Sequence, residues 1–90
     1  MKLIFCRECQ DVVKLRRTNW RKCQCGKSSG RYLADGWYAE IRGSAVPICF
    51  LNSTLLHAIK NRPESGDGTE FTAFVASRSH ESIKTLKNKS

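Results

Sequence analysis

The chain has 90 residues, a formal net charge of +8 and five cysteines. This length suits one small domain, and no apolar run approaches the roughly 20 residues that a membrane-spanning helix needs. The apolar N-terminal residues meet Arg7 before they reach the length of a signal peptide, and the odd number of cysteines argues against a fully paired disulfide framework. We therefore expect a cytoplasmic protein and neither a membrane-spanning nor a secreted one.

The positive charge is concentrated at the two ends of the sequence. Residues 1–31 carry nine basic and two acidic side chains, whereas residues 32–76 carry three basic and five acidic ones. Residues 77–90 carry four basic side chains and one acidic side chain. The excess of cations therefore belongs to the cysteine-rich first third and to the tail.

The first third is predicted to form a β-hairpin. Residues 3–5 read as a short strand, and residues 11–17 alternate apolar and polar side chains as a strand does. A turn at 18–19 would let residues 20–22 return along that strand, because Thr and Asn side chains bond locally to the backbone. Residues 27–30, rich in Ser and Gly, are predicted to be a flexible connector.

The middle of the chain is predicted to form a small sheet. Residues 31–41 read as a hairpin that turns at Asp35 and Gly36, since Asp-Gly between aromatic-rich runs favours a tight turn. Pro47, inside an apolar run, indicates an edge strand or a strand entry, because proline cannot donate a ladder hydrogen bond. We expect the aromatic side chains of this sheet to lie in its core: Tyr32, Trp37 and Tyr38.

A short helix and a last strand follow. Ser53 is a good N-cap for a helix that ends near Asn61, before the Arg-Pro pair. Its buried stripe is predicted to consist of Leu55, Leu56 and Ile59. Residues 70–76 are the most strand-like segment that remains, and one helical turn is expected at 81–86 before the chain frays.

Four of the cysteines form two close pairs, Cys6-x-x-Cys9 and Cys23-x-Cys25, separated by thirteen residues. Two such pairs in tight turns suit a tetrahedral zinc ion bound by four thiolates. An iron site, a disulfide pair and free thiols are the alternatives. Four protein thiolates would leave zinc no position for a catalytic water, so a site of this kind holds the fold together.

This pattern resembles the zinc-ribbon family over residues 1–30. In that family two cysteine knuckles at the ends of a β-hairpin grip one structural zinc ion. The resemblance implies one Zn²⁺ per chain, with Cys6, Cys9, Cys23 and Cys25 as its ligands. The sequence departs from the family in its second pair, which is Cys-x-Cys where Cys-x-x-Cys is usual.

The remaining candidate groups do not indicate an enzyme. Cys49 lies in apolar company and is predicted to be a buried thiol. His57 and His80 are expected at the surface, and neither is a neighbour of Cys49 in the sequence. No triad, open metal site or phosphate-binding loop is apparent, and no small-molecule substrate is indicated.

Basic and aromatic residues are interleaved along the first third. Closely spaced cations can neutralise phosphates, and an exposed tryptophan can stack on an unpaired base. We therefore expect a non-enzymatic module that binds nucleic acid, DNA or RNA, or a complex that contains it. The candidate contacts are Lys14, Arg16, Arg17, Trp20, Arg21, Lys22, Lys27 and Arg31.

A protein-interaction module is the alternative function. A small zinc-held chain with a basic face also suits an adaptor or a phage or bacterial inhibitor that occupies an acidic cleft of a partner protein. For either function the predicted fold is α+β, with a zinc-ribbon hairpin fused to a compact antiparallel sheet and one short helix packed on it. The chain is taken as one domain, comprising the hairpin at 1–30, the sheet and helix at 31–76 and a basic tail at 77–90.

Overall fold

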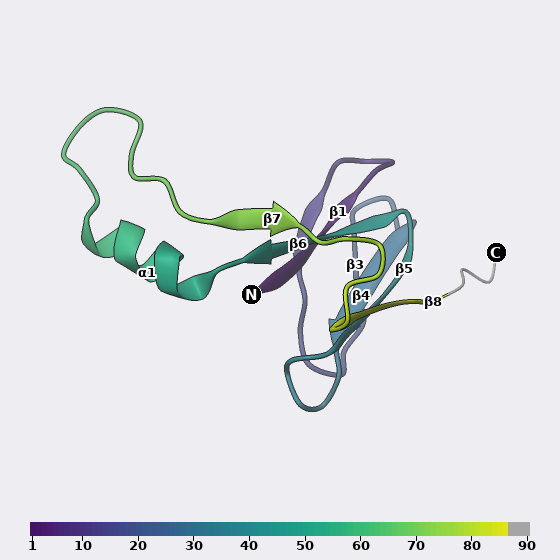
Figure 1. Ribbon diagram of the computed structural model, residues 1–90. Coiled ribbons are helices and arrows are strands. Elements are labelled where there is room, and N and C mark those ends of the chain that lie inside the picture. Colours follow the sequence, from purple (N-terminus) through teal and green to yellow (C-terminus); the bar gives the residue numbers. More distant parts are fainter. Residues whose placement is uncertain (87–90) are drawn as a thin grey trace.

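The protein is built from two four-stranded sheets and one short helix (Figure 1). The structure is a computed structural model that describes residues 1–86. The first sheet is antiparallel throughout and has, in spatial order, β2 (Val12–Lys14), β1 (Lys2–Cys6), β6 (Ala45–Phe50) and β7 (Ala73–Val75). The second sheet has, in order, β3 (Arg21–Lys22), β4 (Ser28–Tyr32), β5 (Ala39–Gly43) and β8 (Ile83–Leu86). The helix is α1 (Asn52–Lys60). A mostly β protein with one helix agrees with the expected α+β class in the coarse sense.

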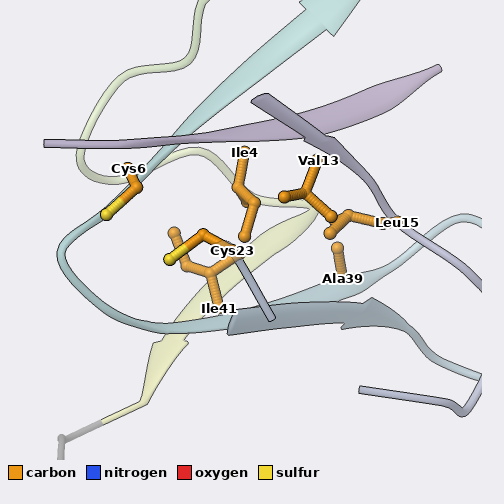
Figure 2. Close-up of a cluster of buried hydrophobic side chains, with 7 residues drawn as sticks. All are labelled: Ile4, Cys6, Val13, Leu15, Cys23, Ala39 and Ile41. Atoms are coloured by element: carbon orange, nitrogen blue, oxygen red, sulfur yellow. The ribbon is translucent and has the colours of Figure 1, made fainter. Parts of the chain in front are cut away.

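The core lies between the two sheets (Figure 2). Side chains on one face of β1 and β2 point toward side chains on β5, because alternate residues of a strand point to the same face. Ile4 pairs with Val13 in the register of the first sheet, and both are buried against Ala39 and Ile41 of the second. Val13 and Leu15, two apolar residues of the alternating segment 11–17, are both buried.

The predicted hairpin between residues 11–17 and 20–22 is wrong. β2 pairs with β1, and β3 pairs with β4, so the two segments belong to different sheets. Residues 15–20 cross from one sheet to the other, and Arg17 forms a bridge with Tyr32 on the way. The basic residues of this region are therefore spread over two sheets and the segment that crosses between them.

The predicted connector at 27–30 is also wrong, because most of it belongs to β4. Ser28 and Gly30 are buried in this internal strand of the second sheet. A Cβ atom placed on Gly30 would come within 2.8 Å of Leu15 Cδ2, so the glycine allows the two sheets to approach closely. The Ser and Gly content that suggested a linker instead reflects close packing.

The hairpin around Asp35 and Gly36 is confirmed. β4 and β5 pair with Arg31 opposite Glu40, and the Asp35 carboxylate accepts hydrogen bonds from the backbone N–H groups of Trp37 and Tyr38 at 3.0 and 3.1 Å. The prediction that both aromatic side chains are core residues is wrong. Trp37 is 62% exposed and Tyr38 is also exposed, because they belong to the turn and not to the paired strands.

Pro47 lies in an internal strand, which contradicts the expected edge position. β6 runs between β1 and β7, and the carbonyl of Pro47 accepts a hydrogen bond from the N–H of Ala76 at 3.0 Å. In an antiparallel ladder the N and O of one residue face the same neighbour. The missing N–H of Pro47 therefore faces the chain just past the end of β7, where it interrupts no strand pairing.

The helix projects away from the sheets instead of packing on them (Figure 1). Its N-cap is Leu51 and not Ser53, and no side chain caps it. Ala58 is its buried residue, whereas Leu56 is 53% and Ile59 is 59% exposed, so the predicted buried stripe is wrong for these two. Residues 51–75, which include α1, a long loop and the exposed edge strand β7, are called the arm below.

The predicted helical turn at 81–86 is a strand. β8 runs parallel to β5, with Ala39 opposite Ile83 and Ile41 opposite Thr85. The second sheet is therefore mixed, and the expectation of a purely antiparallel sheet is wrong. Residues 87–90 of the predicted basic tail lie outside the described part of the chain. Among residues 1–86, the structure has no helix long and apolar enough to cross a membrane.

Candidate metal centre and basic groove

The first cysteine pair lies in the turn between β1 and β2. The N–H of Cys6 donates to the carbonyl of Asp11 at 2.9 Å, and the N–H of Gln10 donates to the carbonyl of Cys6 at 2.8 Å. Gln10 has a φ of +63°, a left-handed conformation that only a small fraction of non-glycine residues adopt. The N–H of Glu8 points at Cys6 Sγ, 3.4 Å away, so backbone dipoles of this turn face the sulfur.

The second pair lies in the turn between β3 and β4 and repeats this arrangement. The N–H of Cys23 donates to the carbonyl of Ser28 at 3.0 Å, and the N–H of Gly26 donates to the carbonyl of Cys23 at 3.1 Å. Gly26 has a φ of +78°. In both turns the residue after the second cysteine is left-handed, which directs the two thiols of each pair to the same side.

The four sulfur atoms converge at one end of the inter-sheet core. The Sγ atoms of Cys6, Cys9, Cys23 and Cys25 all lie within 4.8 Å of one another. Cys25 Sγ is 3.7 Å from that of Cys6 and 3.5 Å from that of Cys23. A tetrahedral ion with metal–sulfur bonds of about 2.3 Å requires sulfurs about 3.8 Å apart. The four cysteines are therefore positioned to hold a metal ion, and the donor set fits one.

The surroundings of the sulfurs favour thiolate character at one ligand. Burial raises the pKa of Cys6, but the polar groups near its sulfur, on Ser28, Cys9 and Glu8, outweigh it and lower this pKa to about 6. A hydrogen bond from the Lys27 backbone lowers the pKa of Cys25, yet burial and the three neighbouring cysteines raise it to about 12. Four thiols this close cannot all ionise without a compensating cation.

Three of the predicted nucleic-acid contacts come together in a groove at the opposite end of β1. Lys14, Arg16 and Arg17 line it from β2 and the crossing segment. Lys2, Tyr32 and Trp37 also line it, and the groove has a volume of about 520 Å³. We call these six residues the basic groove. Because β1 rises about 3.3 Å per residue, its first residue lies about 13 Å from Cys6.

The other predicted contacts lie elsewhere. Two guanidinium groups lie over the Trp20 ring, Arg42 at 3.7 Å and Arg31 at 4.7 Å from its centroid. Arg31 also forms an ion pair of 2.9 Å with Glu40. Three further candidates lie on or beside the hairpin that carries the second cysteine pair: the partly buried Arg21 and the exposed Lys22 and Lys27.

Sequence reasoning missed Lys2, Tyr32 and Trp37 as members of the basic groove. Trp37 was assigned to the core because aromatic residues in a strand pattern are usually buried. Asp35 carried a usable signal, since an Asp two residues before it can fix the turn and place the following side chains outside the sheet. Nothing in the sequence indicates Lys2, which reaches the groove through the pairing of distant segments.

The remaining thiol and the histidines match their predictions in part. Cys49 is buried in β6, as expected. His57 is exposed on the helix, also as expected. His80 is half-buried, and its Nδ1 lies 3.2 Å from the backbone N–H of Ser82, so its expected surface position is only partly correct.

Comparison of the chain with protein-family models, with curated proteins and with solved structures found no match. The functional assignment therefore depends on the residues themselves.

Proposed function

We propose that this chain is a non-enzymatic module, held together by one structural zinc ion, that binds nucleic acid or a nucleic-acid-containing complex through its basic groove. The observation that carries this proposal is the convergence of Lys14, Arg16 and Arg17 on one groove beside an exposed tryptophan.

The choice of zinc follows from the donor set and its setting. Four thiolates in tetrahedral reach of one another are typical of closed zinc sites, which supply folding free energy and no catalytic water. An iron ion could also accept four thiolates. Zinc is favoured because the site lies at the end of the hydrophobic core and joins two sheets, which is a structural role.

The charge of the groove supports a polyanionic partner. Among residues 1–86 the structure contains one ion pair, Arg31–Glu40. None of the cations that line the groove therefore has a carboxylate partner within this part of the chain. Unpaired cations that line a concave surface attract phosphates. With four zinc-bound thiolates the formal charge falls from +8 to about +6, which remains strongly cationic.

Binding to nucleic acid is tested by fluorescence anisotropy with labelled mixed-sequence DNA and RNA over a range of salt concentrations. We expect affinity to fall steeply with salt, with a log–log slope of about −0.7 to −0.9 per phosphate contacted. The double variant Arg16→Glu with Arg17→Glu should abolish binding. The matched control is Lys60→Glu with Arg62→Glu, which changes the net charge equally on the arm. Absence of binding by the unchanged protein at low salt would refute the proposal.

The apolar surface of the arm favours a second candidate, a protein-interaction module. Leu56, Ile59, Phe74 and Val75 are all exposed, with Val75 at 66%. Leu56 and Ile59 lie on the projecting helix, and Phe74 and Val75 lie on the edge strand β7. Exposed large apolar residues of this kind are found at binding surfaces. A pull-down from nuclease-treated lysate tests this candidate, with Leu56→Gln and Ile59→Gln as the variant. A partner that is lost after nuclease treatment, or that the variant still captures, would argue against a protein-binding role for the arm.

A further inference from the structure

Trp37 is held at the mouth of the basic groove with much of its indole ring free. The turn that carries it is fixed by the Asp35 carboxylate, which accepts the N–H of Trp37. The Lys2 ammonium donates to the carbonyl of Trp37 at 2.8 Å and lies 4.2 Å from the centroid of its ring. A cation over an aromatic face is attracted by the ring quadrupole and limits its rotation. The residue remains 62% exposed, so its indole offers a rigid surface for another planar group.

Arg17 packs directly against the turn that presents Trp37. A Cβ atom placed on Gly36 would come within 2.5 Å of the Arg17 Nε, and Gly36 has a φ of +71°. The glycine therefore both permits the turn and leaves room for the guanidinium. This contact keeps a guanidinium group beside the tryptophan, which is the combination that a nucleotide requires: a cation for phosphate and an aromatic plane for the base.

The Lys2 side chain adds a buried cation to the same wall. Lys2 is buried, and burial is the main cause that lowers its pKa below the usual value. Within residues 1–86 its Nζ has a carbonyl and two aromatic rings as neighbours but no carboxylate within ion-pair distance. A buried ammonium with no carboxylate in direct contact is costly, and a bound anion would offset that cost.

We propose that the basic groove binds single-stranded nucleic acid, with an unpaired base stacked on the exposed surface of Trp37 and the adjacent phosphates held by Lys14, Arg16 and Arg17. This inference rests on the proposed function and narrows it to one strand form and one stacking residue. Duplex bases are stacked on one another and cannot present a free face to an indole ring, so the geometry favours an unpaired strand.

Trp20, the tryptophan that the sequence indicated for this role, is less available. The guanidinium groups of Arg31 and Arg42 already lie over its ring, and the Nε of Arg42 is buried there without a hydrogen-bond partner among the described residues. A base would have to displace one of these groups. Trp37 requires no such displacement on its exposed side.

The experiment measures the anisotropy of labelled 12-nucleotide single strands of mixed sequence, DNA and RNA, and of the matching duplex at one salt concentration. We expect the single strand to bind at least about tenfold more tightly than the duplex, and Trp37→Ala to weaken single-strand binding by about tenfold, as for loss of one stacked base. Trp37→Phe should retain most of the affinity because it keeps an aromatic face.

The control is Tyr38→Ala, which removes the neighbouring exposed aromatic side chain of the same turn but does not line the groove. It should change the affinity less than twofold, and zinc content verifies that each variant is folded. Equal binding of duplex and single strand, or equal effects of Trp37→Ala and Tyr38→Ala, would overturn this inference while leaving the proposed function intact. No binding of either nucleic acid would overturn both.

Discussion

The Asp11 carboxylate accepts a hydrogen bond of 2.9 Å from the backbone N–H of Gln24. Asp11 follows the first cysteine pair, and Gln24 lies between the two cysteines of the second. One side chain therefore connects the two metal-binding turns, which belong to different sheets. This hydrogen bond holds the two turns close together whether or not a metal ion is bound.

Replacement of Asp11 by Ala should weaken the connection between the turns. A hydrogen bond to a charged group contributes roughly 1.5–3 kcal/mol, and because this one is exposed we expect a loss of about 1 kcal/mol in the free energy of unfolding. Urea unfolding of the zinc-loaded protein and competition with a chelator measure stability and metal retention. Asp67→Ala, in the exposed loop of the arm, is the charge-matched control, and an equal loss there would contradict the role given to Asp11.

Loss of one metal ligand should unfold at least the cysteine-bearing end of the protein. We expect about one zinc ion per chain by elemental analysis, and neither Cys9→Ser nor Cys25→Ser should retain it, because a structural metal site and its fold form together. Cys49→Ala is the matched control, since it removes a buried thiol distant in sequence from the cluster and should keep the zinc. A metal-free protein with an unchanged melting curve would show that the site is not structural.

Gly43 should not tolerate a side chain. It has a φ of +79°, and a Cβ atom there would lie 1.9 Å from the carbonyl oxygen of Lys27, which also accepts the N–H of Ser44. Backbone strain and overpacking each cost roughly 1–3 kcal/mol, so Gly43→Ala should lower the free energy of unfolding by about 2–6 kcal/mol. Thermal unfolding measures the loss.

Gly66 provides the control for that substitution. Its φ of +87° is equally left-handed, but a Cβ atom there meets no atom within 4 Å among the described residues. Gly66→Ala should therefore cost only the backbone term, about 1 kcal/mol. If both alanine variants lose the same stability, the close contact at Gly43 is not the cause.

The apolar helix residues should be nearly neutral for stability. Leu56→Gln and Ile59→Gln replace exposed side chains, so each should change the free energy of unfolding by no more than about 0.5 kcal/mol. Leu15→Ala, at a residue that is 2% exposed in the core, should cost about 2–5 kcal/mol. Denaturant unfolding at low protein concentration compares them. A large loss at Leu56 would indicate that the helix packs on the body of the protein.

The convergence of the four cysteines could be predicted from the sequence because its signal is local. Close spacing within each pair places two thiols in one turn, and both pairs converge as the pattern indicates. The strand pairing could not be predicted in the same way. Each cysteine pair occupies the turn of its own hairpin. Val12–Lys14 therefore pairs with β1, which precedes it in the chain, and Arg21–Lys22 pairs with β4, which follows it. Short strands of two or three residues carry too little alternation to reveal their partners.

The errors in the middle and the last part of the chain have a different physical origin. The sequence of Ser28 to Gly30 has the composition of a linker, yet the small side chains serve close packing between sheets. The helix stripe was predicted from periodicity alone, which shows an apolar face but not what covers it. In the described residues Leu56 and Ile59 are not covered, and this is the information that the sequence could not supply.

The residues of the basic groove come from both halves of the core: Lys2 and Lys14 lie in the first sheet, Tyr32 lies in β4 of the second, and Trp37 lies in the turn between β4 and β5. The cysteine pairs are divided between the sheets in the same way, at the opposite end of the shared core. The cysteine cluster and the basic groove thus lie at the two ends of the core that the sheets share. We expect the spacing of the two sheets at the cysteine end to influence the width of the groove at the other end. Removal of the metal should therefore alter ligand affinity at a distance, although no metal ligand lines the groove.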